Sequence, residues 1–361
     1  MSLDLDTAFQ ELQRILKRHP VLVVGTGASC ALDPRFGMEA LAKELPERIH
    51  LEAGREAQQW NGVLEELKAH RTLEEALDAV TEKGLVNRIV AATGAFVAKV
   101  DGEWAWRVAT GTTAPLNGLL RKLVHGLPPT NPLQHVVTPN YDMLVEHTCG
   151  ALGVPYTDGF TGGSTCRRDW VAAGNSMLIR THEPRGKTWA DVTRYRPHVR
   201  LHKVHGSINW LQDEHEDRLL RCDRSTDVDA PVGWRRAMIT PGRSKLAEAG
   251  VKRDWFTEAD NAIGAAHAFL IVGYGFNDDH IQKRMRTKLA DQGCPGIVVT
   301  RDWTERIKDW IRQSSDLWAV CRNPSGDNTG SIIAGPANVD APLECYDRNI
   351  WDIASFSDAV M

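Results

Sequence analysis

The sequence predicts an α/β protein: a Rossmann-like, doubly wound parallel sheet with an inserted layer of helices. Short apolar runs that read as buried strands alternate with helical patterns, which is the order typical of a parallel sheet. Two of these runs, at 21–24 and 268–272, end at glycine-containing loops. From Trp60 to about Arg121 the pattern stays helical, which predicts a helical layer inserted after the first strand and helix.

The first strand, 21–24, leads directly into the turn Gly25-Thr26-Gly27-Ala28-Ser29-Cys30. Gly25 and Gly27 carry no side chain that would keep a ligand from the backbone. A helix that starts at or soon after Ser29 would point N–H groups toward a diphosphate at this turn. The dinucleotide fingerprint has a third glycine where this chain has Cys30, so the turn equally fits an ordinary strand-to-helix connection.

The remaining elements follow from apolar periodicity. In chain order they are helices at 7–18 and 38–49, a strand at 135–138, a helix at 143–149, a strand at 199–204, a helix at 255–266, a strand at 268–272, a helix at 281–289, a strand at 296–300 and a helix at 304–311. The segment at about 158–198 is rich in Gly, Thr, Arg and Trp with weak periodicity, and it predicts a loop-rich excursion that could also hold short strands.

Composition excludes several classes of protein. Apolar residues make up 42% and charged residues 25% of the chain, which is normal for a globular protein with a packed core. A net charge of −4 argues against direct nucleic-acid binding. No apolar run reaches membrane-spanning length and no signal peptide is evident, so we expect a cytoplasmic protein without membrane contact. Seven scattered cysteines without C-x-x-C pairs predict neither a disulfide framework nor a zinc site.

Four motifs stand in order along the chain, at the ends of predicted strands: Gly25-x-Gly27-x-Ser29, Thr138-x-Asn140-x-Asp142, His205-Gly206-Ser207 and Gly273-Tyr274-Gly275-Phe276-Asn277-Asp278. Together they resemble the sirtuin-like family. The second motif is similar to the sirtuin T-Q-N-I-D motif with Pro139 and Tyr141 substituted, and the third to its H-G motif. The fourth is similar to the phosphate- and ribose-side loop of bacterial sirtuin-like proteins. The resemblance covers roughly residues 8–315.

The resemblance implies a domain organisation. Residues 1–322 would form a sirtuin-like, Rossmann-type NAD-binding domain. A helical insertion would span about 36–127, and the loop-rich excursion about 158–198. Residues 323–361 would form a C-terminal extension that packs on this body.

The resemblance also implies an activity. Deacetylase sirtuins carry a zinc module with two C-x-x-C pairs, and its absence here puts the acyl-lysine groove in doubt. The chain looks closer to NAD-hydrolysing effectors of bacterial anti-phage defence, which would use NAD as substrate without a metal. A stand-alone effector of this length resembles those that act with a separate HerA-type hexameric ATPase, so the resemblance implies such a partner. Because a toxic NAD hydrolase must be restrained, we also expect a homo-oligomer.

Candidate site residues follow from the motifs. Asn140 would orient the attacking water or the ribose hydroxyls, because an amide both donates and accepts. His205 would act as general base or polarise a ribose hydroxyl, and Asp142 would anchor a ribose hydroxyl or the carboxamide. The predicted NAD-binding positions are Gly25, Thr26, Gly27, Ala28, Ser29, Thr138, Gly206, Gly273, Tyr274, Gly275, Asn277 and Asp278.

Each assignment has a structural alternative. Asn140 and Asp142 could only cap a helix, and Ser29 could cap a helix as well as bind phosphate. Asn277 and Asp278 could contact the adenosine ribose or only start the helix at Ile281. Histidines are often structural, which is the reading we give His202.

Two other functions stay open at this point. The chain could be an NAD-dependent protein deacylase or ADP-ribosyltransferase, against which the missing zinc module counts. It could also be a non-catalytic module that senses NAD or ADP-ribose, which would bind the nucleotide tightly without turnover.

Overall fold

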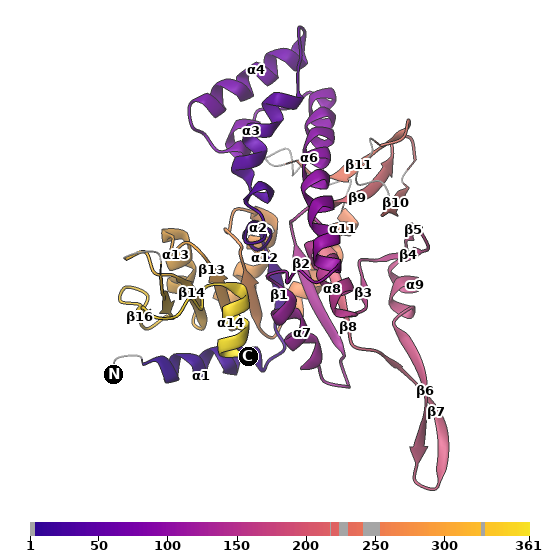
Figure 1. Ribbon diagram of the computed structural model, residues 1–361, viewed down its shortest axis with the longest axis vertical. Helices are drawn as coiled ribbons and strands as arrows, with labels where there is room; N and C mark the ends of the chain where they lie inside the picture. The colour runs from indigo at the N-terminus through magenta and orange to yellow at the C-terminus, as the bar shows by residue number, and fades with distance from the viewer. Residues whose placement is uncertain (1–3, 217, 224–229, 241–252, 326–328) are drawn as a thin grey trace.

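The computed structural model describes residues 4–216, 218–223, 230–240, 253–325 and 329–361 (Figure 1). Its centre is a nine-stranded sheet. In spatial order the strands are β16 (Leu343–Cys345), β15 (Ser331–Ala334), β14 (Leu317–Arg322), β13 (Gly296–Thr300), β12 (Phe269–Val272), β1 (Val21–Val24), β2 (Leu133–Thr138), β8 (His198–Lys203) and β3 (Tyr156–Thr157).

The order of these strands is that of a doubly wound sheet. All pairs from β3 to β14 are parallel, whereas β15 and β16 join antiparallel. From β1 the chain moves outward through β2 to β8, and then crosses back to β12 on the other side of β1. The winding therefore reverses between β1 and β12, where open α/β sheets bind their ligands.

Both faces of the sheet are covered, which explains the uniformly apolar sequences of the central strands β1 and β12. Leu22 and Val24 of β1 face one core, and Val21 and Val23 face the other, because successive side chains of a strand point to opposite faces. The helices of the first core are α1 (Leu5–Leu16), α7 (Asn117–His125), α8 (Leu144–Leu152) and α14 (Ile353–Val360). Those of the second are α11 (Arg253–Gly264), α12 (Asp279–Arg286) with the π-helical turn η2 (Thr287–Asp291), and α13 (Glu305–Gln313). The predicted fold class is confirmed.

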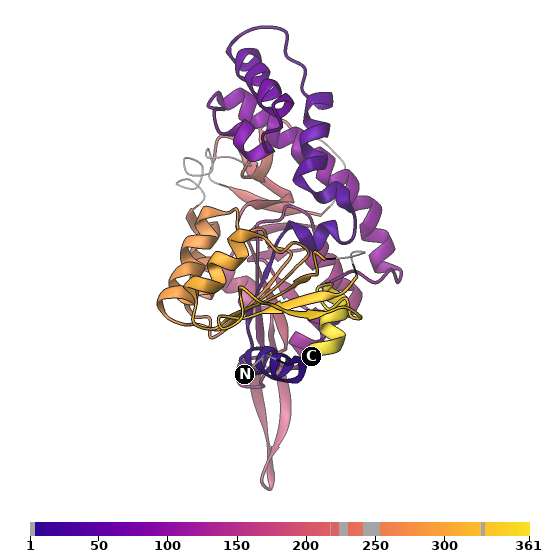
Figure 2. The ribbon, with the colours of Figure 1, turned by 90° about the vertical axis from the view of Figure 1, so that its left-hand side faces the viewer.

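A separate group of helices follows β1 (Figures 1 and 2). Its members are α2 (Thr26–Cys30), η1 (Pro34–Phe36), α3 (Met38–Arg48), α4 (Arg55–Lys68), α5 (Leu73–Leu77) and α6 (Lys83–Ala109). Helices α3 to α6 enclose a core of their own. Although α7 lies within the predicted insertion at 36–127, its leucines pack in the core of the main sheet.

The segment at 158–198 consists mostly of strands and one short helix, so it is less rich in loops than predicted. It contains β4 (Phe160–Gly162), β5 (Thr165–Arg168), α9 (Trp170–Asn175), β6 (Leu178–Arg185) and β7 (Thr188–Tyr195). With β9 (Gly206–Asp213), β10 (Leu219–Cys222) and β11 (Trp234–Met238), β4 and β5 form a second sheet in the order β11-β9-β10-β5-β4. Strands β6 and β7 pair only with each other and project from the body (Figure 1). They bury no apolar face, so their sequence lacks the alternation that marks a strand.

The C-terminal residues extend the main body. Strands β15 and β16 lengthen the sheet, and α14 packs against α7. Among the residues that the structure describes, no helix is both long and apolar enough to cross a membrane.

Candidate active site

The four sequence motifs meet at one edge of the sheet. They follow β1, β2, β8 and β12, which are neighbours in the order β8-β2-β1-β12. Since these strands are parallel, their carboxyl ends lie together. Residues from distant parts of the sequence thus converge where the sheet changes its winding.

Glycines bring the first and fourth motifs into contact. A Cβ atom on Gly25 would lie 2.5 Å from the backbone of Gly273 and Tyr274, and one on Gly27 would lie 2.7 Å from Gly273 O. Gly273 has a φ of +58°, in the left-handed region that glycine adopts at no steric cost. The close approach of the two loops therefore explains these glycines, and their contact with a ligand stays a prediction.

Helix α2 begins earlier than the sequence suggested. Its N-cap is Gly25 and its first residue is Thr26, so the predicted start at or after Ser29 is wrong. The N–H of Gly27 already donates to Gly273 O at 2.8 Å, because the two loops touch. Ala28 and Ser29 are buried in this short helix, and Ser29 faces the second motif instead of capping a helix.

Four side chains from the first and second motifs form a chain of hydrogen bonds. Thr26 Oγ1 donates to Asn140 Oδ1 at 3.3 Å, and Asn140 Nδ2 donates to Ser29 Oγ at 3.1 Å. Ser29 Oγ then donates to Asp142 Oδ2 at 2.8 Å. Asn140 and Asp142 are each only 7% exposed. The chain fixes both side chains against α2.

Further contacts hold the loop that carries Asn140 and Asp142. Thr138 Oγ1 donates to Val24 O at 2.7 Å and accepts from Asn140 N at 3.1 Å. Asp142 Oδ1 accepts from Leu144 N at 3.1 Å and so also supports the start of α8. Asp142 thus supports the start of α8 and faces the motif cluster, and its contact with a ribose hydroxyl or the carboxamide stays a prediction.

Lys203 is a functional candidate that the sequence analysis missed. Its buried ammonium donates to Asp142 O at 2.5 Å and to Glu146 Oε1 at 2.9 Å. Burial raises the pKa of both the Asp142 and Glu146 carboxyls, and the charge of Lys203 opposes this rise. Lys203 follows the apolar Val199 and Leu201 at alternate positions of β8, and this alternation is the sequence signal that could have indicated its burial.

Asp101 of the helical layer was also missed. Its Oδ1 accepts from Met143 N at 2.8 Å, and its Oδ2 lies 2.8 Å from His147 Nε2. This buried carboxylate ties α6 to the start of α8, directly after the second motif. The sequence signal was an acidic residue on the apolar face of a predicted helix.

His205 stands at the end of β8 and is 5% exposed. Its Nε2 atom lies 2.6 Å from Asp278 Oδ2 in the fourth motif. The ring of Tyr141 lies beside it, with 6.4 Å between ring centroids, and Tyr141 OH donates to Ile239 O at 2.5 Å. Gly206 has a φ of +79° with its Cα close to Ala237, which fixes the turn after His205.

His202 does not belong to this cluster. Its Nε2 lies 3.0 Å from His135 Nδ1, and its ring stacks on Trp170.

The rest of the fourth motif is divided between core and surface. Tyr274 is buried, and its OH donates to Asp278 O at 3.4 Å. Gly275 and Asn277 are exposed. Arg306 bonds both Phe276 O and the Asn277 side chain. Asp278 Oδ1 accepts from Ile281 N at 2.9 Å and caps α12, as one predicted reading required.

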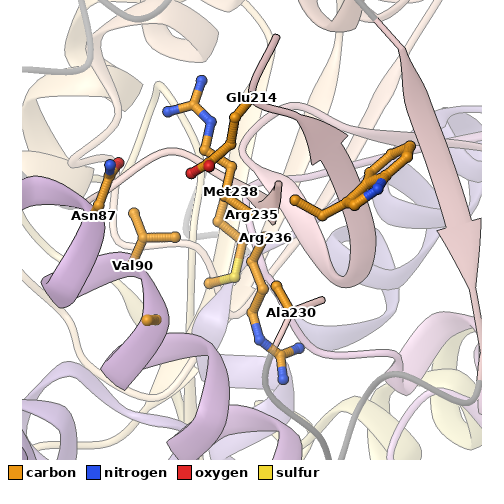
Figure 3. Close-up of a pocket in the computed structure, with 9 residues that line it drawn as sticks. Asn87, Val90, Glu214, Ala230, Arg235, Arg236 and Met238 are labelled. Atoms are coloured by element: carbon orange, nitrogen blue, oxygen red, sulfur yellow. The ribbon is translucent and has the colours of Figure 1, made fainter. Parts of the chain in front are cut away.

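Two cavities lie away from this cluster. One, of about 270 Å³, is formed between α6 and β11 and includes Asn87, Glu214, Trp234 and Arg235 (Figure 3). The other, of about 360 Å³, lies between the end of α8 and Tyr156. Neither is lined by a predicted site residue. Within the described ranges, no group of three or more His, Cys, Asp or Glu side chains is placed to hold a metal ion.

The cluster brings hydrogen-bonding side chains and a His–Asp pair to the carboxyl ends of neighbouring strands. Asn140, Ser29 and Thr26 offer donors and acceptors for hydroxyl groups. His205 Nε2 lies 2.6 Å from the Asp278 carboxylate, a geometry that a general base can use.

Comparisons with solved structures find several Sir2 proteins. One is a structure of a study on the mechanism and regulation of Sir2 enzymes. Its sequence is 12% identical, and the match covers 84% of this chain and 89% of the Sir2 chain with a TM-score of 0.37. A Sir2–p53 peptide–NAD+ structure is 10% identical, with a TM-score of 0.36 over 94% and 91% of the two chains. Sir2Tm bound to a propionylated peptide is 12% identical, with a TM-score of 0.36 over 86% and 91%.

The comparison with curated proteins gives no match. The comparison with protein families matches residues 134–314 to the SIR2-like domain. That range holds the second, third and fourth motifs and spans just over half of the 361 residues. The chain therefore belongs to the SIR2-like family.

Proposed function

We propose that this chain is an NAD+ glycohydrolase that cleaves NAD to nicotinamide and ADP-ribose. The proposal rests on the family and on one observation: Asn140, Asp142 and His205 converge at the carboxyl ends of adjacent strands, beside the point where the sheet reverses its winding. The first and fourth motifs flank this point, as a dinucleotide site requires. The roles of the individual residues are part of the proposal.

The chemistry needs little covalent help from the protein. The bond between C1′ of the ribose and the nicotinamide nitrogen breaks, and nicotinamide leaves with the bonding electron pair. The ribose passes through an oxocarbenium-like transition state, as in other glycoside cleavages. Asn140 would orient the water that adds to C1′, and His205 would take the proton that this water loses. Asp142 would hold a ribose hydroxyl.

The test is to separate the products of NAD incubated with the purified protein by chromatography. A glycohydrolase releases nicotinamide and ADP-ribose in equal amounts without any other acceptor. Release that depends on an added acyl-lysine peptide would contradict the proposal and support the deacylase. Transfer of ADP-ribose to protein would support the transferase.

A non-catalytic sensor of NAD or ADP-ribose is the second candidate. The observation that favours it is burial: Asn140, Asp142, His205 and Asp278 are each between 5% and 7% exposed. Tight nucleotide binding without any turnover would support this reading over the first.

We further propose a cytoplasmic role in anti-phage defence by NAD depletion, with a HerA-type ATPase as partner. The support for this role is the resemblance of the motifs to such effectors.

We also propose that the chain forms a homo-oligomer. The support for this proposal is the β6–β7 hairpin, on which Trp189 is 62% exposed. Residues 178–196 carry five Lys and Arg against two Asp and Glu, on a chain with a net charge of −4. A second copy of this chain offers the complementary charge.

A further inference from the structure

The carboxylate of Asp278 is engaged through both of its oxygens. Oδ2 lies 2.6 Å from His205 Nε2, and Oδ1 accepts from Ile281 N at 2.9 Å. The side chains of His205 and Asp278 are 7% and 6% exposed. A buried charge of this kind is retained where it is paired and hydrogen-bonded. The carboxylate is thus fixed to the start of α12 on one side and to the imidazole on the other.

The backbone around His205 is fixed independently of its ring. His205 O accepts from Ile239 N at 3.0 Å. A side chain at Gly206 would collide with Ala237 O, so the turn after His205 has room only for glycine. With the main chain held, the orientation of the imidazole depends on what its ring nitrogens contact. The contact that the structure shows for Nε2 is Asp278.

We infer that Asp278 is the positioning residue of His205 and not a ligand of the adenosine ribose. It holds the proton of the neutral imidazole on Nε2, which leaves Nδ1 as the nitrogen that accepts a proton. This inference rests on the proposed function for its catalytic meaning. The pairing itself, however, is a property of the folded protein and can be measured without substrate.

The pairing also accounts for the place of Asp278 in the chain. The residue stands between the exposed Asn277 and the buried Ile281, at the N-cap of α12. An N-cap needs only one acceptor oxygen, which Ser, Asn and Asp supply about equally well. A cap therefore does not require a carboxylate, whereas the second oxygen of a carboxylate can both accept the proton on Nε2 and stabilise the charged imidazole.

Asp278→Asn and Asp278→Ser separate these roles, because both can keep the cap of α12 and both lose the charge. Asp352→Asn is the matched control. Asp352 caps α14 in the same way, through a bond from Ser355 N of 3.0 Å. We expect kcat for NAD cleavage to fall on the order of 100-fold in both Asp278 variants, with KM changed less than about threefold. A ribose ligand would instead give a raised KM with kcat kept, and this result would overturn the inference.

Nitrogen NMR of the His205 ring in the protein without NAD decides the pairing separately from activity. The inference predicts the Nε2–H tautomer in the wild type and in Asp352→Asn, and a changed tautomer equilibrium in Asp278→Asn and Asp278→Ser. An unchanged His205 ring spectrum in both Asp278 variants would overturn it, even if their activity fell. An inactive wild type with the predicted NMR spectra would refute the proposed function and leave the pairing standing.

Discussion

Single side chains at the ends of β2 and β8 hold the candidate site through buried polar contacts. Ser29 links Asn140 to Asp142, and Lys203 holds Asp142 O and Glu146. A buried polar group without a partner costs free energy, so each of these contacts constrains its neighbours. At this scale the site is organised by the motif residues Ser29, Asn140 and Asp142 together with Lys203, which lies outside the sirtuin-like motifs.

Lys203→Met should lower the free energy of unfolding by about 3–5 kcal/mol, because it leaves the buried Glu146 carboxylate unpaired. The double variant Lys203→Met with Glu146→Gln should recover much of that loss. Urea titration measures both. Arg71→Met, in an exposed ion pair with Glu66, is the control and should change stability by less than about 1 kcal/mol. A double variant no more stable than Lys203→Met would contradict this account of the pair.

Helix α6 joins the helical layer to the site. Asp101 on α6 supports Met143 N and His147 at the start of α8. Burial lowers the pKa of His147 because it disfavours the charged imidazole. The hydrogen bond to Asp101 and the negative charges of Asp101, Glu146 and Asp142 outweigh this effect. Together they raise the pKa of His147 from 6.5. The contact between the insertion and the main body is thus strongest when His147 is protonated.

This contact predicts how stability depends on pH. A histidine whose pKa is higher in the folded state stabilises fully below its unfolded pKa, and loses this contribution as pH rises through the folded pKa. Other groups being equal, the contribution of His147 should therefore disappear as pH rises above about 6.5. The measurement is the difference in unfolding free energy between the wild type and His147→Gln across pH 5.5 to 8.5. A difference that is constant with pH, or that grows as pH rises, would refute the assignment.

At the scale of the whole molecule, the sheet with its strand-end loops could be predicted from sequence and much of the rest could not. Apolar runs that end in glycine or polar residues mark buried strands wherever they occur. The β6–β7 hairpin was missed because it buries neither face. The pairing of His205 with Asp278 was missed for another reason: it depends on β8 and β12 lying on opposite sides of β1 and β2, which no local pattern shows.

The exposed hairpin makes a prediction about assembly. Replacing residues 179–194 by a short Gly-Ser turn between Leu178 and Tyr195, which are paired in register, should lower the mass of the assembly. The described hydrophobic cores contain no residue of β6 or β7, so the body should still fold. Mass photometry compares this variant with the wild type and with Trp106→Ala, whose tryptophan is 74% exposed on α6. A monomeric wild type, or an unchanged mass on deletion, would contradict the proposed interface.

The most direct test of the account is the rate of nicotinamide release from NAD by the wild type, His205→Ala and His267→Ala. His205 lies buried at the carboxyl end of β8, whereas His267 is exposed just before the amino end of β12. The two variants therefore remove the same kind of side chain from opposite ends of the parallel strands. We expect release by the wild type and by His267→Ala at similar rates, and a loss on the order of 100-fold or more in a folded His205→Ala. Equal rates in all three proteins would contradict the proposed active site.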